Sequence, residues 1–158
     1  MAKTFVGSRT DEMARTEYIC GNPFSDLKLA AGDFSRLEEV WRQEWLDIGA
    51  VPPRAVTDRT VRSFREGDPD RVIAHYMQPH CPFVPHPELM AAKDPVQWGD
   101  QDTKDVWARL RDSELTEDTV WRGYREDLEY VLEVALLLNN VDADEVVITS
   151  DHGNAMGE

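Results

Sequence analysis

The order of β-favouring and helical segments constrains the fold of this chain more than any other sequence feature. Short apolar runs at 16–20, 71–77 and 145–150 each lead into a turn-forming cluster, and helical patterns lie between them. Strands that alternate with helices in this order predict right-handed crossovers between parallel strands. We therefore expect one α/β domain over residues 1–158, with an open, mostly parallel sheet and flanking helices.

Three helices are expected, the second of them short. The first runs from Ser35 to Gly49, where Ser35 and Glu38 can form a capping box at its start. Its apolar stripe would consist of Leu37, Val40, Trp41, Trp45 and Ile48. The second runs from about Thr57 to Gly67, and the longest from about Thr116 to Asn140. The Pro-rich stretch from residue 78 to about residue 103 is predicted to be a loop of the long kind that tends to be functional.

The charge of the chain excludes two classes of partner. It has 31 Asp+Glu against 17 Lys+Arg, a formal net charge of -14, so a nucleic-acid backbone or an anionic membrane surface would be repelled. Evenly spread acids, with Arg in place of Lys, favour a halophilic protein, and an ordinary acidic mesophile protein is the alternative. No stretch has the length of a membrane span or a signal peptide, so we expect a cytoplasmic protein without a membrane partner.

The strand exits are the expected location of a site, because ligands bind beyond the carboxyl ends of parallel strands. Asp151 and His152 follow the last predicted strand and offer a carboxylate and an imidazole, which suit Zn, Mn or Mg. Gly153 would let the backbone turn both side chains toward one ion. The alternative is a plain strand-to-loop turn, with Asp151 as a cap and His152 in solvent.

His80 follows the middle strand and lies between Pro79 and Pro82, which restrict its backbone. A His fixed in this way can direct a donor at an anionic oxygen, and a surface His without a partner is the alternative. We expect His75 to be a satisfied core residue and His86 a loop residue.

No residue in the chain has the setting of a catalytic nucleophile. Cys20 and Cys81 lack the spacing of a disulfide framework or a zinc ribbon and are expected to be buried or half-buried thiols. The chain also lacks a nucleophile elbow and a Gly-rich phosphate loop with Lys.

Residues 146–153, followed by Gly157 and Glu158, resemble the late metal-binding motif of the alkaline phosphatase and sulfatase superfamily. The segment 75–83 is similar to the strand and Pro-His-x-Pro loop that precede this motif, and the helix around 124–132 is similar to the one that joins them. With residues 21–24 the resemblance spans most of the chain, and it is closest to cytoplasmic sulfatase-like proteins of halophilic archaea.

The resemblance implies an alkaline phosphatase-like fold and a metal-dependent hydrolase of sulfate or phosphate esters. Asp151 and His152 would bind a divalent metal, either Zn, Mn, Mg or Ca, and His80 would contact the anionic oxygens of the ester or protonate the leaving group. The partner would be a small anionic ester substrate. The sequence does not determine the oligomeric state, and a homo-oligomer is compatible with it.

The chain departs from the family pattern at its start. Family members begin with a strand that ends in metal-binding acids, followed by a Thr, Ser or modified Cys nucleophile, and there is no counterpart before Thr16. Neither cysteine lies in the Cys-x-Pro-x-Arg motif of the modified-Cys enzymes. We therefore assign no catalytic residue and expect an incomplete domain, without the nucleophile region and the C-terminal end, that is inactive in isolation.

Two other functions remain open. One is a non-catalytic metal-binding or protein-interaction module that pairs with a partner through its sheet edge and Pro-rich loop. The other is a different metallohydrolase, in which His75, His80 or His86 joins Asp151 and His152 around one ion. The latter requires three or more of these side chains at about 2.0–2.2 Å from the metal.

Overall fold

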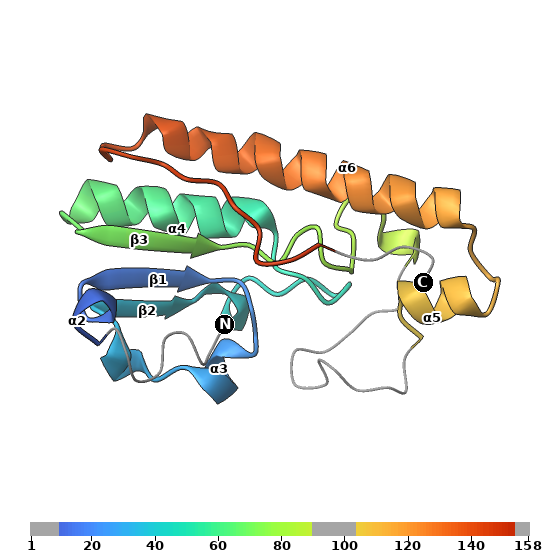
Figure 1. Cartoon of the computed structure of the whole chain (residues 1–158), viewed down its shortest axis with the longest axis horizontal. Helices are drawn as coiled ribbons and strands as arrows, with labels where there is room; N and C mark the ends of the chain where they lie inside the picture. Colours follow the sequence, from blue (N-terminus) through green and yellow to red (C-terminus); the bar gives the residue numbers. More distant parts are fainter. Residues whose placement is uncertain (1–9, 90–103, 154–158) are drawn as a thin grey trace. The chain divides into compact units, whose positions relative to one another are not determined.

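A computed structural model describes residues 10–89 and 104–153 of the chain (Figure 1). The chain divides into two compact units. The first consists of Met1–Leu46 and Val51–Met77, and the second of Asp47–Ala50 and Gln78–Glu158. No helix in the described ranges is both long enough and apolar enough to cross a membrane.

The first unit is built on a parallel sheet (Figure 1). Strands β1 (Thr16–Cys20), β2 (Arg36–Glu39) and β3 (Arg71–His75) lie in the order β2-β1-β3, with β1 in the middle. Both pairings are parallel, so all three strands end at the same edge. The predicted α/β class and parallel sheet are confirmed, as are the strands expected at 16–20 and from residue 71.

The two faces of β1 carry different cores, because side chains alternate across a strand. Ile19 is fully buried with Val51 and Val56 on the face covered by helix α4 (Pro53–Glu66). Tyr18 and Cys20 pack with Met13 and Phe34 on the other face. Short segments complete this unit: α2 (Thr10–Met13), α3 (Ser25–Lys28) and a 3-10 turn at Ala31–Asp33.

The second predicted helix is confirmed as α4, which begins at Pro53 rather than Thr57. Proline fits the first turn of a helix because its missing N–H would have no helical partner there.

Just after β1, the Gly21 amide donates to the His75 carbonyl at 3.0 Å. A Cβ at Gly21 would lie 3.2 Å from that oxygen, so glycine allows the chain to pass close to β3.

The helix predicted from Ser35 to Gly49 is wrong. Residues 36–39 form strand β2, and a 3-10 turn follows at Val40–Arg42. The side chains alternate as in a strand: Leu37 packs with the Tyr18 core, while Arg36 and Glu38 enter a polar network on the other side. Backbone pairing with β1 thus replaces the intrahelical hydrogen bonds that the local spacing favoured.

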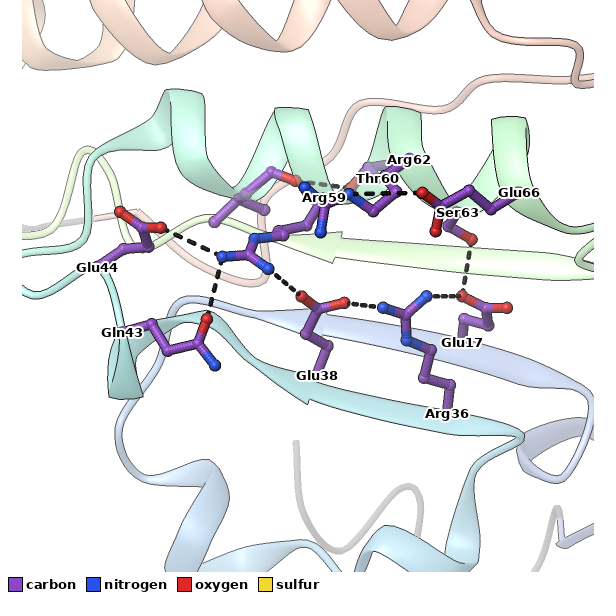
Figure 2. A network of polar contacts seen from close by, with 11 residues as sticks. Glu17, Arg36, Glu38, Gln43, Glu44, Arg59, Thr60, Arg62, Ser63 and Glu66 are labelled. Carbon is purple, nitrogen blue, oxygen red and sulfur yellow. Dashed lines mark hydrogen bonds and ion pairs between the residues drawn. The ribbon is translucent and has the colours of Figure 1, made fainter.

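Figure 2 shows the polar network that links β1 and β2 to α4. Arg36 pairs with Glu17 at 3.5 Å and also with Glu38. Arg59 of α4 pairs with Glu38 at 3.3 Å, and the Ser63 hydroxyl donates to Glu17 at 2.7 Å. These charges are half-buried and alternate in sign, so each carboxylate on the strands has a donor from a neighbouring element.

The second unit contains α5 (Val106–Arg111), α6 (Glu117–Ala135) and 3-10 turns at Pro87–Leu89 and Leu136–Asn140. The longest predicted helix is confirmed as α6 with its 3-10 extension. Thr116 caps α6 by accepting from the Thr119 amide at 3.3 Å. The core of this unit is formed by Phe83, Val106 and Val120, each fully buried, with Cys81 and Leu89 beside them.

The strand predicted at 145–150 is wrong within the described chain. These residues have no regular structure, and Val147 and Ile148 are 70% and 51% exposed. A strand exists only when its backbone groups pair with a neighbour, and the sheet in residues 10–89 and 104–153 consists of β1, β2 and β3. Part of the long loop predicted up to residue 103 lies outside the described residues, from 90 onward.

Candidate functional site

The carboxyl edge of the sheet is the position where the fold predicts a site, and it carries three polar side chains. Cys20, Glu39 and His75 are the last residues of β1, β2 and β3, and they are directly opposite one another in the register. The Nδ1 atom of His75 lies 2.7 Å from the Tyr18 hydroxyl and 3.6 Å from the Cys20 sulfur. His75 is therefore a satisfied residue of this unit, as expected.

Cys20 has the properties of a structural thiol. Its side chain is 1% exposed, and burial raises the pKa of the thiol above its usual value, despite opposing hydrogen bonds at the Asn22 backbone. The Asn22 amide donates to the sulfur at 3.3 Å. A protonated and covered thiol is a poor nucleophile. Cys20 and Cys81 are both buried, as predicted.

Ser25 and Glu39 form a pair that sequence reasoning missed. The Ser25 hydroxyl donates to Glu39 Oε1 at 2.6 Å and accepts from the Trp41 indole at 3.1 Å. Arg42 donates to the other Glu39 oxygen at 2.7 Å. The carboxylate is thus saturated by protein donors and Ser25 is buried, so the pair closes this edge of the sheet rather than offering a nucleophile. No sequence motif relates the two positions, which adjoin only once β2 pairs with β1.

His80 lies in the second unit and is exposed. Its Nδ1 atom is 2.7 Å from the Cys81 carbonyl, which orients the ring against its own backbone. The peptide bonds before Pro79 and Pro82 are both cis. The imidazole of His80 is thus exposed in a segment bounded by two prolines.

Asp151 and His152 are also exposed and belong to the same unit as His80. Asp151 Oδ1 lies 3.9 Å from His152 Nε2. His152 Nδ1 is 2.9 Å from the Gly153 carbonyl, and Ser150 donates to the His152 carbonyl. In the described part of the chain, the partners of both side chains are confined to residues 150–153. The structure brings the carboxylate and the imidazole together, but after an exposed segment without regular structure rather than a strand.

The pair fits a divalent metal in ligand type but not in number. A carboxylate oxygen and an imidazole nitrogen are suitable donors, whereas a catalytic zinc site uses three protein ligands. No group of three or more His, Cys, Asp and Glu that could hold a metal occurs within residues 10–89 and 104–153. Asp151 and His152 are thus two potential donors, fewer than such a site requires.

The imidazole of His86 contacts two glutamates rather than Asp151 or His152. Its Nδ1 atom lies 3.0 Å from Glu88 Oε1, and its Nε2 atom lies 2.5 Å from Glu126 Oε2. His75 is bonded to Tyr18 in the other unit. The alternative site, in which His75, His80 or His86 joins Asp151 and His152, is therefore not found within residues 10–89 and 104–153, where no three such side chains could hold one metal.

Asp127 is a second residue that sequence reasoning missed. It is fully buried on α6, where Oδ1 accepts from the Val84 amide at 3.0 Å. Its other oxygen, Oδ2, has no hydrogen-bond partner among the described residues. Burial raises the pKa of the Asp127 carboxyl to about 7, against the opposing effects of the Val84 amide and His86. The available signal was an acid within the apolar stripe formed by Val120, Tyr124 and Val131.

Comparisons with known proteins give no relative for this chain. No protein-family model, no curated protein and no solved structure matches it.

Proposed function

We propose that this chain carries part of the active site of a metal-dependent hydrolase for sulfate or phosphate esters, of the alkaline phosphatase and sulfatase type. Asp151 and His152 are proposed as metal ligands, and His80 as the residue that contacts the anionic ester. A divalent metal in such a site supplies charge for the anionic oxygens of the ester. No residue of this chain is proposed as the nucleophile, so the isolated chain is expected to be inactive.

The observation that carries this proposal is the exposed carboxylate-imidazole pair. Asp151 and His152 lie 3.9 Å apart, and no other segment of the described chain uses either side chain. Acidic and imidazole side chains that stabilise a fold are normally paired or capped by other elements, as Glu39 and His75 are here. His80 adds a third exposed polar residue in the same unit.

Isothermal titration calorimetry with Mn, Zn and Ca in high salt tests the metal half of the proposal. Micromolar binding to the native chain is expected, with losses of about tenfold or more in Asp151→Ala and His152→Ala. Asp144→Ala is the matched control, because Asp144 is an exposed acid close to the pair in sequence. Equal binding by all four proteins, or no binding by the native chain, would overturn the assignment.

Binding of inorganic sulfate and phosphate by the metal-loaded chain tests the ester half. His80→Gln should weaken anion binding several-fold without changing metal affinity, because His80 is proposed to contact only the anion. An anion affinity that is insensitive to His80→Gln would remove this residue from the site.

A second candidate is a protein-interaction module, favoured by the exposed apolar segment around Val146, Val147 and Ile148. Such a run of exposed β-branched residues can pair with a strand of a partner. Analytical ultracentrifugation would detect self-association, which Val147→Asp should abolish. A monomer at all concentrations would count against self-pairing through this segment.

A further inference from the structure

The Pro-rich segment 81–89 is held on α6 at neighbouring positions. Phe83 is fully buried and lies over Gly123, where a Cβ atom would come within 2.7 Å of the Phe83 ring. One helical turn further on, Asp127 accepts from the Val84 amide at 3.0 Å. His86 then reaches Glu126, the residue beside Asp127, at 2.5 Å. The segment is therefore attached by apolar contacts of Phe83 and Leu89 and by two contacts to titratable groups.

The unpartnered oxygen of Asp127 makes the middle attachment unusual. A carboxylate has acceptor sites on both oxygens, yet Oδ2 has no partner in the described chain and the side chain is fully buried. An ionised carboxyl in that position carries a desolvation cost that one amide donor does not offset. The neutral acid avoids this cost and keeps Oδ1 as the acceptor for Val84.

We propose that residues 83–88 and α6 form a pH-responsive latch, in which protonation of Asp127 and His86 closes the segment on the helix and loss of these protons loosens it. The proposal stands on contacts within one unit and does not depend on the hydrolase function.

The charges around the latch set the direction of its response. On the segment they are His86 and Glu88, and on α6 they are Glu126 and Asp127 itself. Two arginines add positive charge that does not titrate: Arg122 of α6 acts on Glu88, and Arg109 of α5 donates to the Leu89 carbonyl at 2.9 Å. Deprotonation leaves three carboxylates around a neutral imidazole. Protonation leaves a neutral Asp127 and an imidazolium between Glu88 and Glu126.

Both titrations act in the same sense. Burial raises the pKa of Asp127 from 3.8 to about 7, so its contribution to stability is complete below 3.8 and is lost as pH rises through 7. For His86, burial lowers the pKa, but hydrogen bonds to Glu126 and Glu88 outweigh it and raise the pKa above 6.5. Its contribution is complete below 6.5 and is also lost as pH rises.

Amide hydrogen exchange of the full chain, followed by NMR between pH 6 and pH 8, tests the latch. After correction for intrinsic exchange, the protection factor of the Val84 amide should fall by about tenfold or more over this range. The β1 amides of Tyr18 and Ile19 serve as an internal reference, because they belong to the other unit. Constant protection of Val84 in the native chain would overturn the proposal.

Two substitutions separate the contributions. Asp127→Asn keeps the shape and the acceptor for Val84 but cannot ionise, and His86→Gln keeps polar contacts without the charge. Each should reduce the pH dependence of Val84 protection, and the double variant should abolish it. An undiminished pH dependence in the double variant would contradict the latch. If Asp127→Asn fails to fold, the native titration and the His86→Gln variant still test the latch. An unchanged pH dependence of Val84 protection in His86→Gln would show that His86 is not part of it.

Discussion

Gly123 shows how one residue position can be specified entirely by a partner that is distant in sequence. It lies in the interior of α6, where glycine is a poor helix former and alanine would be preferred. The space for a Cβ atom is occupied instead by the Phe83 ring and by Leu89. The same helix buries Asp127 without complete hydrogen bonding, so two residues on one stripe depart from helix preference because of the segment that they contact.

Gly123→Ala is expected to destabilise the chain, although alanine favours the helix itself. Its Cβ atom would lie 2.7 Å from Phe83 Cδ2 and 3.0 Å from Leu89 Cδ1, which forces repacking of a core ring. Overpacking of this kind costs about 1–3 kcal/mol, partly offset by about 1 kcal/mol of helix propensity. Urea unfolding followed by fluorescence measures the net change. Gly32→Ala is the control, because nothing lies within 4 Å of a Cβ built there; an equal effect of both substitutions would contradict the steric argument.

At the scale of elements, β2 shows that pairing can outweigh local pattern. Residues 36–39 carry an apolar spacing that fits a helix, but in the structure they pair with β1, and their charges join the network with Glu17 and Arg59 (Figure 2). Strands β1 and β3 were predictable from short β-favouring runs, and α4 and α6 from longer amphipathic ones. β2 was not, because its stability comes from backbone pairing with β1 and from contacts with α4 rather than from its own local pattern.

Arg59→Met is expected to weaken the attachment of α4 to β2. Arg59 pairs with Glu38 at 3.3 Å and with Glu44 at 3.2 Å, and its side chain is only 21% exposed. The substitution removes a half-buried charge and leaves Glu38 with Arg36 alone. It should lower the free energy of unfolding, measured by urea titration, by about 1–2 kcal/mol. The matched control is Arg54→Met. The side chains of Arg54 and its partner Asp58 are 61% and 57% exposed, so this substitution should lower the free energy of unfolding by less than about 0.5 kcal/mol. Similar losses in both variants would show that burial of the network is irrelevant.

At the scale of the whole molecule, the chain carries a large net charge. With 31 acidic against 17 basic residues, we expect repulsion among the acids to exceed the attraction in the local ion pairs. The two compact units each contain their own buried core, with the sheet in the first and the α5 and α6 helices in the second. Screening should therefore favour the folded state as a whole.

Salt is expected to stabilise the chain. Raising KCl from 0.1 to 1 M shortens the screening length from about 10 Å to about 3 Å and should increase the free energy of unfolding by on the order of 1 kcal/mol. Thermal unfolding monitored by circular dichroism measures this dependence. Replacing the exposed acids Asp142 and Asp144 with Asn should reduce the gain, since it removes repulsive charges. A stability that falls with salt would mean that the attractive pairs dominate instead.

The sequence by itself determined the α/β class, strands β1 and β3, helices α4 and α6, and the buried state of Cys20, because each follows from local periodicity or from apolar content. It also predicted that Asp151 and His152 lie side by side, since they are adjacent in the chain. Only the tertiary structure decided that residues 36–39 are a strand, that residues 145–150 are exposed, and that Asp127 is buried beside Val84. Those outcomes depend on which backbone or side chain is the neighbour in the fold. The local sequence pattern does not specify a neighbour that is distant in sequence.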